Sequence, residues 1–153
     1  MVNKDLILLE EEITNREQAL EVMIQKANEL GYLQDKEIYK AEVIAREEMM
    51  PTSVGFKVAI PHGRSKSVSY PFVVFLRNKK EFIWDDRNEN EVDLIFMIGV
   101  PEANENNLHL RFLAEISKKL MNDDFRENLR KANNKEEVYE MLQDINEKVI
   151  SNN

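Results

Sequence analysis

The sequence predicts an α/β fold: a single domain in which a mixed β-sheet of about five strands is flanked by helices on both faces. Apolar residues recur at helical spacing in the first and last thirds of the chain, whereas the middle carries short apolar runs typical of buried strands. No repeat or low-complexity linker divides these parts, and 153 residues is a usual size for one domain. We therefore expect one domain over residues 1–153, with its core at about 5–148.

Two helices are predicted before the strand-rich middle. The first begins at Thr14, whose spacing to Glu17 matches a capping box, and it ends at Gly31. The second is capped by Asp35 and ends near Pro51, because the residue before a proline disfavours helical geometry. Each helix carries an apolar face that is expected to pack against the sheet.

Four apolar segments are expected to form strands. Residues 6–9 are a short run suited to the edge of a sheet. Within residues 56–60 every second side chain is large and apolar, which is the period of a strand. Residues 72–76 and 92–98 are almost wholly apolar, as in central strands that are covered on both faces.

Helical spacing returns after Pro101. Three apolar stripes follow, over residues 112–120, 125–129 and 138–145. Because helices are predicted on both sides of the strand-rich segment, we expect them to cover both faces of the sheet.

Charge, hydropathy and cysteine content exclude several classes of protein. The net charge of −8 repels phosphate backbones and anionic lipid, so neither nucleic acid nor a membrane surface is expected as the main partner. No apolar run approaches the roughly 18 residues of a membrane span, and the N-terminal residues lack the pattern of a secretory signal. There are no cysteines, which removes disulfides, thiolate nucleophiles and cysteine-based zinc sites. We expect a cytoplasmic protein without direct membrane insertion.

His62 is the first candidate for chemistry. It follows the predicted strand over 57–60 and stands between Pro61 and Gly63, at the carboxyl end of a strand, where open α/β sheets place ligands. Proline fixes the preceding backbone, glycine lets a bulky anion approach the main chain, and Ser65 offers a hydroxyl donor. A neutral imidazole keeps a lone pair that can attack phosphorus. An ordinary loop histidine is the alternative that these residues leave open.

His109 is the second candidate. It precedes Phe112, Leu113 and Ile116 at helical spacing, so it shares their inward face, one turn nearer the helix N-terminus. The first turn of a helix favours anions, because amide groups are free there and the dipole is positive. A buried structural histidine is the alternative reading.

Other routes to phosphate or metal chemistry have little support. The four glycines are too scattered for a dinucleotide-binding fingerprint, and no phosphate-binding loop motif occurs. The two histidines together with Asp93 or Glu102 offer metal-ligand types, but no ligand spacing typical of a metal site accompanies them. We expect neither a metal nor an organic cofactor.

The string Gly55-Phe56-Lys57-Val58-Ala59-Ile60-Pro61-His62-Gly63 resembles the active-site signature of the mannitol/fructose-type enzyme IIA family of the sugar phosphotransferase system (EIIA type 2). Arg46-Glu47, Thr52-Ser53 and the segment 109–114 extend the resemblance over nearly the whole chain. Many members have glycine at the position of Lys57, and this departure puts the substrate branch in question more than the activity.

The resemblance implies roles for several residues. His62 would be the phosphoryl acceptor, with His109 and Arg46 completing the catalytic set. An imidazole donor and a guanidinium suit the charge on the three phosphoryl oxygens. Four further residues are expected to help stabilise the phosphoryl group: Gly63, Thr52, Ser53 and Ser65.

The same resemblance implies partners. Phosphorylated HPr would donate the phosphoryl group, and a cysteine of a cognate enzyme IIB would accept it for sugar uptake through the membrane enzyme IIC. The alternative is a regulatory, nitrogen-type protein whose phosphorylation state controls protein binding. Neither the sugar nor the oligomeric state is readable from the sequence.

Overall fold

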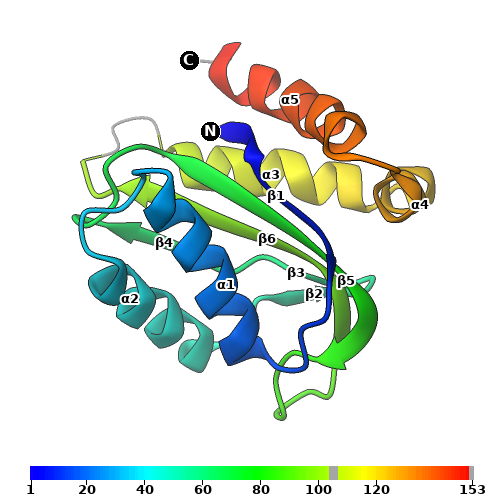
Figure 1. The fold of residues 1–153 in the computed structure, drawn as a ribbon, viewed down its shortest axis with the longest axis horizontal. Coiled ribbons are helices and arrows are strands. Elements are labelled where there is room, and N and C mark those ends of the chain that lie inside the picture. The colour runs from blue at the N-terminus through cyan, green and yellow to red at the C-terminus, as the bar shows by residue number, and fades with distance from the viewer. Residues whose placement is uncertain (104–106, 152–153) are drawn as a thin grey trace.

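The computed structural model describes residues 1–103 and 107–151, so the predicted domain end at residue 153 lies outside the described residues. Within these residues a mixed six-stranded sheet lies between two layers of helices, which confirms the predicted α/β class (Figure 1). The elements, in chain order, are β1 (Val2–Glu11), α1 (Arg16–Glu29), α2 (Lys36–Met49), β2 (Ser53–Gly55), β3 (Val58–Ala59), β4 (His62–Ser65), β5 (Phe72–Ile83), β6 (Glu91–Pro101), α3 (Leu108–Leu120), α4 (Asp123–Lys131) and α5 (Lys135–Ser151).

The strands follow the order β1-β5-β6-β3-β2, and β4 also pairs with β6. The pairs β1–β5, β3–β6 and β4–β6 are parallel, whereas β5–β6 and β2–β3 are antiparallel. Because β3 and β4 follow one another along the same side of β6, six strands occupy five positions across the sheet. The run at 6–9 belongs to β1, which lies at the edge as predicted.

Two hydrophobic clusters hold the helices to the sheet. Side chains of α1 and α2 pack on one face, and those of α3, α4 and α5 pack on the other (Figure 1). The side chains of β5 alternate between the clusters: Phe72, Val74 and Leu76 point to the first, while Val73 and Phe75 point to the second. This double burial explains why the central strands appear in the sequence as continuous apolar runs.

The predicted helix ends are close to those observed, with one correction. The cap of α1 is Asn15 and not Thr14, because the Asn15 side chain accepts a hydrogen bond from the Gln18 amide at 2.8 Å. The Thr14 amide in turn donates a hydrogen bond to the Gln18 side chain. Gln18 therefore takes the place in the capping interaction that the spacing had assigned to Glu17.

The end of α1 and the start of α2 agree with the prediction. Gly31, with φ of 84°, follows the last turn of α1. Asp35 caps α2 by accepting from two backbone amides, and α2 ends at Met49, just before Pro51.

The predicted strand at 56–60 is wrong in its first half. Phe56 and Lys57 form a tight turn with φ values of 57° and 64°, directly after Gly55 with φ of 88°. The Arg126 guanidinium lies 4.1 Å from the centre of the Phe56 ring. This tertiary contact helps to stabilise a left-handed backbone that non-glycine residues seldom adopt. Only Val58 and Ala59 continue as a strand.

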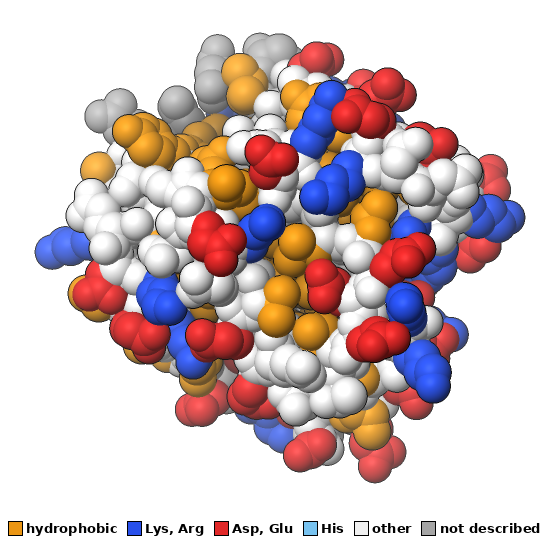
Figure 2. Space-filling view, in the orientation of Figure 1, with side chains coloured by type: hydrophobic (Ala, Val, Ile, Leu, Met, Phe, Trp, Pro, Cys, Tyr) orange, Lys and Arg blue, Asp and Glu red, His pale blue; other side chains and the backbone are white. Residues whose placement is uncertain are grey.

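The surface carries charges of both signs. On the face shown in Figure 2, acidic and basic side chains are interspersed, and neither sign forms a large patch of its own. None of the described helices combines the length and the apolar composition that a bilayer crossing requires.

Candidate functional site

The site is built around β4, which the sequence did not reveal as a strand. After β3 the chain bends at Ile60 and Pro61, then pairs again with β6, so that His62 lies opposite Ile98 and Gly63 opposite Gly99. His62 is therefore the first residue of a second short strand, whereas the prediction placed it in a loop after the first. A side chain on a strand has a fixed direction, so this pairing sets the side of the sheet to which the imidazole points.

Gly63 shows which side that is. A Cβ atom at Gly63 would lie 3.1 Å from the ring of Tyr39 and 3.2 Å from Val43, so this residue faces α2 at close approach. Because successive side chains of a strand alternate, His62 and Arg64 point to the opposite side, toward α3.

The imidazole of His62 is half-buried and has a defined hydrogen bond. Its Nδ1 lies 2.8 Å from the carbonyl oxygen of Ile60. A carbonyl only accepts, so Nδ1 carries the proton of the neutral ring, and the lone pair is on Nε2. The site thus presents an imidazole whose free nitrogen is set by the backbone.

Several effects act on the His62 pKa. Burial lowers it most, and the hydrogen bond to Ile60 opposes that shift. The positive charge of Arg46 lowers the pKa further, while the negative charge of Glu47 raises it. The net shift is downward from 6.5, which favours the neutral ring at pH 7.

Helix α2 brings Arg46 to this site. The Tyr39 hydroxyl donates to the Ile98 carbonyl at 2.8 Å, and Val43 packs one turn later beside Gly63. Arg46 follows Val43 by three residues and so continues the same helix face. Its Nη1 donates to the Met50 carbonyl at 2.8 Å, beyond the end of the helix.

Helix α3 brings His109. Its side chain is half-buried, one turn before buried Phe112, as its predicted place on the inward face requires. Burial lowers the His109 pKa first, and the nearby charges of His62 and Arg64 lower it further. The structure thus brings both Arg46 and His109 within electrostatic reach of His62. His109 lies in the first turn of α3, and that turn, within the described residues, carries no acidic side chain.

The predicted hydroxyl donors are engaged elsewhere. The Thr52 hydroxyl donates to the Glu47 carboxylate, which can only accept. The Ser65 side chain is buried on the α2 side of β4, where its hydroxyl lies 2.8 Å from that of Ser67. Ser53 lies within 3.4 Å of two asparagine amides. A role for these three residues at the phosphoryl group stays a prediction.

Arg64 belongs to the site although the sequence analysis did not identify it. It lies two residues after His62 on the same face of β4, and its charge acts on His109. Its Nε donates to the Glu102 carbonyl at 2.8 Å. The period-two spacing from His62 would have indicated Arg64, had residues 62–65 been recognised as a strand.

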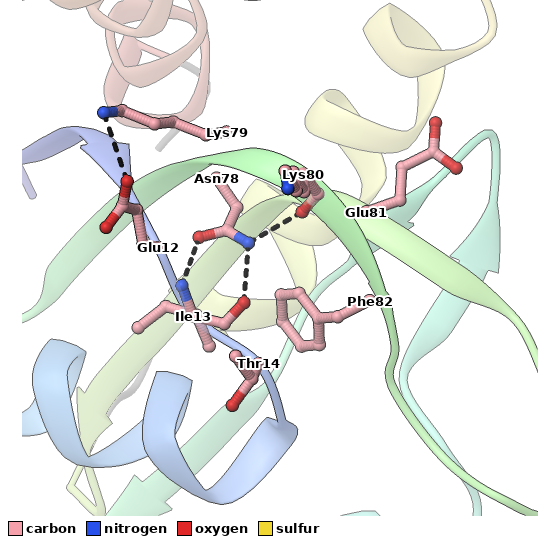
Figure 3. Close-up of a pocket in the computed structure, with 8 residues that line it drawn as sticks. All are labelled: Glu12, Ile13, Thr14, Asn78, Lys79, Lys80, Glu81 and Phe82. Atoms are coloured by element: carbon pink, nitrogen blue, oxygen red, sulfur yellow. Dashed lines mark hydrogen bonds and ion pairs between the residues drawn. The ribbon is translucent and has the colours of Figure 1, made fainter.

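The pocket drawn in Figure 3 is lined by residues 12–14 and 78–82, and by neither histidine. Its centre is the Asn78 side chain, which accepts from the Ile13 amide at 2.7 Å and donates to the Ile13 carbonyl at 2.9 Å and the Lys80 carbonyl at 2.7 Å. These bonds replace regular strand pairing where the chain leaves β1. Among the described residues, no group of three or more His, Cys, Asp or Glu side chains could hold a metal ion.

The fold and site define a class: an α/β protein with a half-buried histidine beside several basic groups. The chain belongs to the EIIA 2 family of the phosphoenolpyruvate-dependent sugar phosphotransferase system, whose family model matches residues 1–145. The resemblance that the histidine motifs indicated is thereby confirmed.

Relatives include both sugar-specific and regulatory proteins. The chain is 34% identical over 141 residues to the fructose-specific EIIA component of Haloferax volcanii, covering 92% of this chain and 91% of that protein. The crystal structure of the nitrogen regulatory protein IIA-Ntr from Neisseria meningitidis superposes with a TM-score of 0.83 at 28% identity, over 92% of this chain and 95% of that one. The mannitol enzyme IIA of Escherichia coli, solved in complex with phosphorylated enzyme IIB, shares the fold with a TM-score of 0.78 at 21% identity, over 94% and 99% of the chains.

The electrostatics of the site predict how His62 titrates. We expect its pKa below the ordinary value of about 6.5, because burial penalises the charged ring. Arg46→Ala should raise this pKa, since a positive charge that opposes protonation is removed. An NMR titration of the ring protons measures both values. Lys40→Ala, which removes a cation of α2 that pairs with Glu21, serves as the control and should leave the His62 pKa unchanged.

A His62 pKa at or above 6.5, or one that does not respond to Arg46→Ala, would contradict this electrostatic account.

Proposed function

We propose that this chain is a phosphoryl carrier of the sugar phosphotransferase system, in which His62 accepts a phosphoryl group and passes it on. The observation that carries the proposal is the hydrogen bond between His62 Nδ1 and the Ile60 carbonyl. It fixes the tautomer whose Nε2 has the lone pair, so the nucleophile needs no general base. Family membership and the cations beside the ring support the same role.

The transfer conserves atoms and charge. The Nε2 lone pair forms a bond to phosphorus as the bond between phosphorus and the donor histidine breaks, and that electron pair returns to the donor ring. The Nδ1 proton stays on His62, so its ring becomes a phosphorylated imidazolium. Arg46 and His109 offset charge on the phosphoryl oxygens during transfer. In the onward step a thiolate attacks phosphorus and the electron pair returns to Nε2.

The proposed partners follow from the family. Phosphorylated HPr is the donor, and a cysteine of a cognate enzyme IIB, coupled to the membrane enzyme IIC, is the acceptor. The mannitol enzyme IIA with the same fold was solved as a complex with phosphorylated enzyme IIB, which supports a direct contact of this kind. Such an exchange takes place in the cytoplasm.

A regulatory role is the second candidate. The similarity to the nitrogen regulatory protein favours it, since that structure matches 92% of this chain. The two roles differ in whether an enzyme IIB receives the phosphoryl group. Genes for enzymes IIB and IIC beside this one would favour transport, and an isolated gene without a permease would favour regulation.

The proposal predicts one labelled residue. With radiolabelled phosphoenolpyruvate, enzyme I and HPr, the protein should take up one acid-labile phosphoryl group, and His62→Ala should abolish the label because the only free ring nitrogen on β4 is lost. Lys40→Ala is the control, since it removes a cation of α2 that pairs with Glu21, and it should keep the label. Labelling that persists in folded His62→Ala would place the acceptor elsewhere.

Arg46 and His109 should affect rate more than fold. We expect Arg46→Ala and His109→Ala each to slow transfer in both directions by about 100-fold, the usual effect of losing one stabiliser of transition-state charge. Rapid-quench measurements with HPr as donor and as acceptor give the two rates, and circular dichroism checks the fold. Rates within about twofold of the wild type would assign both side chains a structural role.

A further inference from the structure

Glu47 is the most unusual polar group near the site. It lies in the last turn of α2 next to Arg46, yet its exposed fraction is 0%. Its carboxylate accepts from the Thr52 amide at 3.0 Å, from the Thr52 hydroxyl and from the Trp84 indole nitrogen at 3.0 Å. None of these three donors carries a charge. Burying a carboxylate is costly, and neutral groups of the same shape would make such contacts at lower cost.

Hydrogen bonds connect this carboxylate to His62. Glu47 holds both the amide and the hydroxyl of Thr52. The Thr52 carbonyl accepts from the Ile60 amide at 3.0 Å, and the Ile60 carbonyl lies 2.8 Å from His62 Nδ1. Thr52 and Ile60 therefore link the buried Glu47 carboxylate to His62 Nδ1. This is the nitrogen that keeps its proton when His62 is phosphorylated.

The groups that face the imidazole are mostly basic. Arg46 comes from α2, His109 from α3, and Arg64 lies on the same face of β4. Glu47 is the acidic group that acts on His62, and its charge favours the protonated ring. A phosphorylated imidazolium formed among these basic groups needs such a counter-charge on its Nδ1 side.

We propose that Glu47 is a positioning residue that stabilises the imidazolium form of phosphorylated His62, through its negative charge and through its hold on Thr52 and Ile60. This inference rests on the proposed carrier function. Phosphorylation at Nε2 with the proton kept on Nδ1 gives the ring a positive charge, and that form is the better leaving group, because departure of the phosphoryl group returns a neutral imidazole. Glu47 thus keeps the carrier ready to pass its phosphoryl group on.

Glu47→Gln separates charge from shape. The glutamine carbonyl can accept from the Thr52 amide and from Trp84, and its NH₂ group can donate to the Thr52 hydroxyl. Glu48→Gln is the matched control, because it removes the same charge from the next residue, whose side chain is exposed. Both proteins are phosphorylated with enzyme I and HPr, and the ring pKa and the pH dependence of phosphoryl transfer to unlabelled HPr are measured.

For Glu47→Gln we expect the pKa of the phosphorylated ring to fall by about one unit, so that transfer above that pKa slows about tenfold. At low pH, where the ring is protonated in both proteins, the rates should converge. Glu48→Gln should match the wild type. An unchanged ring pKa and pH profile in Glu47→Gln would overturn the inference, because a purely structural residue would alter neither.

If Glu47→Gln does not fold, Trp84→Phe takes its place: it leaves the carboxylate and its bonds to Thr52 intact but removes the indole donor that offsets the charge, so the ring pKa should rise, and a pKa that stays or falls would overturn the inference. If the wild type takes no label at all, the carrier function fails instead. Labelling of wild type and Glu47→Gln with identical pH profiles would reject only the role of Glu47.

Discussion

The hydrogen bond between the Ile60 carbonyl and His62 Nδ1 is the constraint on which the rest of the site depends. It decides which ring nitrogen is free, and therefore which atom can react. The carbonyl is held in place because the Ile60 amide is bonded to Thr52 on one side and because β4 resumes pairing with β6 immediately after Pro61. In the proposed transfer, the backbone thus fixes the tautomer whose free nitrogen attacks phosphorus, and no side-chain base is needed.

The sheet supports this geometry through close packing at two glycines. Gly63 lies beside Gly99 in the ladder, and a Cβ at Gly99 would approach the Phe72 ring to 2.3 Å. Because both positions lack a side chain, Phe72 and Tyr39 pack against one another with their ring centres 5.6 Å apart. Tyr39 in turn fixes α2 to β6, and with it the position of Arg46. A larger residue at Gly63 would press on Tyr39 and Val43 of the helix that carries the guanidinium.

Much of the fold could be predicted from the sequence, because the features that determine it are encoded by neighbouring residues. Caps such as Asp35, the break before Pro51 and the continuous apolar runs of β5 and β6 depend on near neighbours or on periodicity. The histidine motifs indicated the family and a candidate nucleophile, and the inward place of His109 followed from its spacing to Phe112.

The remaining features depend on contacts between distant residues. The turn at Phe56 and Lys57 keeps a left-handed backbone that ordinary residues avoid, and its partner Arg126 lies 70 positions further on. β4 has only four residues, which is too few for the two-residue period of a strand to be recognised in the sequence. The sequence analysis therefore did not identify Arg64. The engagement of Thr52 with a buried carboxylate, itself bonded to Trp84, likewise has no local signal.

The central claim is that the backbone leaves Nε2 of His62 as the reactive atom. NMR of the phosphorylated protein with ¹⁵N-labelled histidine tests it most directly, because the coupling between nitrogen and phosphorus identifies the bonded atom. The account predicts phosphorus on Nε2 of His62, with the proton still on Nδ1. Phosphorus on Nδ1, or on His109, would contradict it.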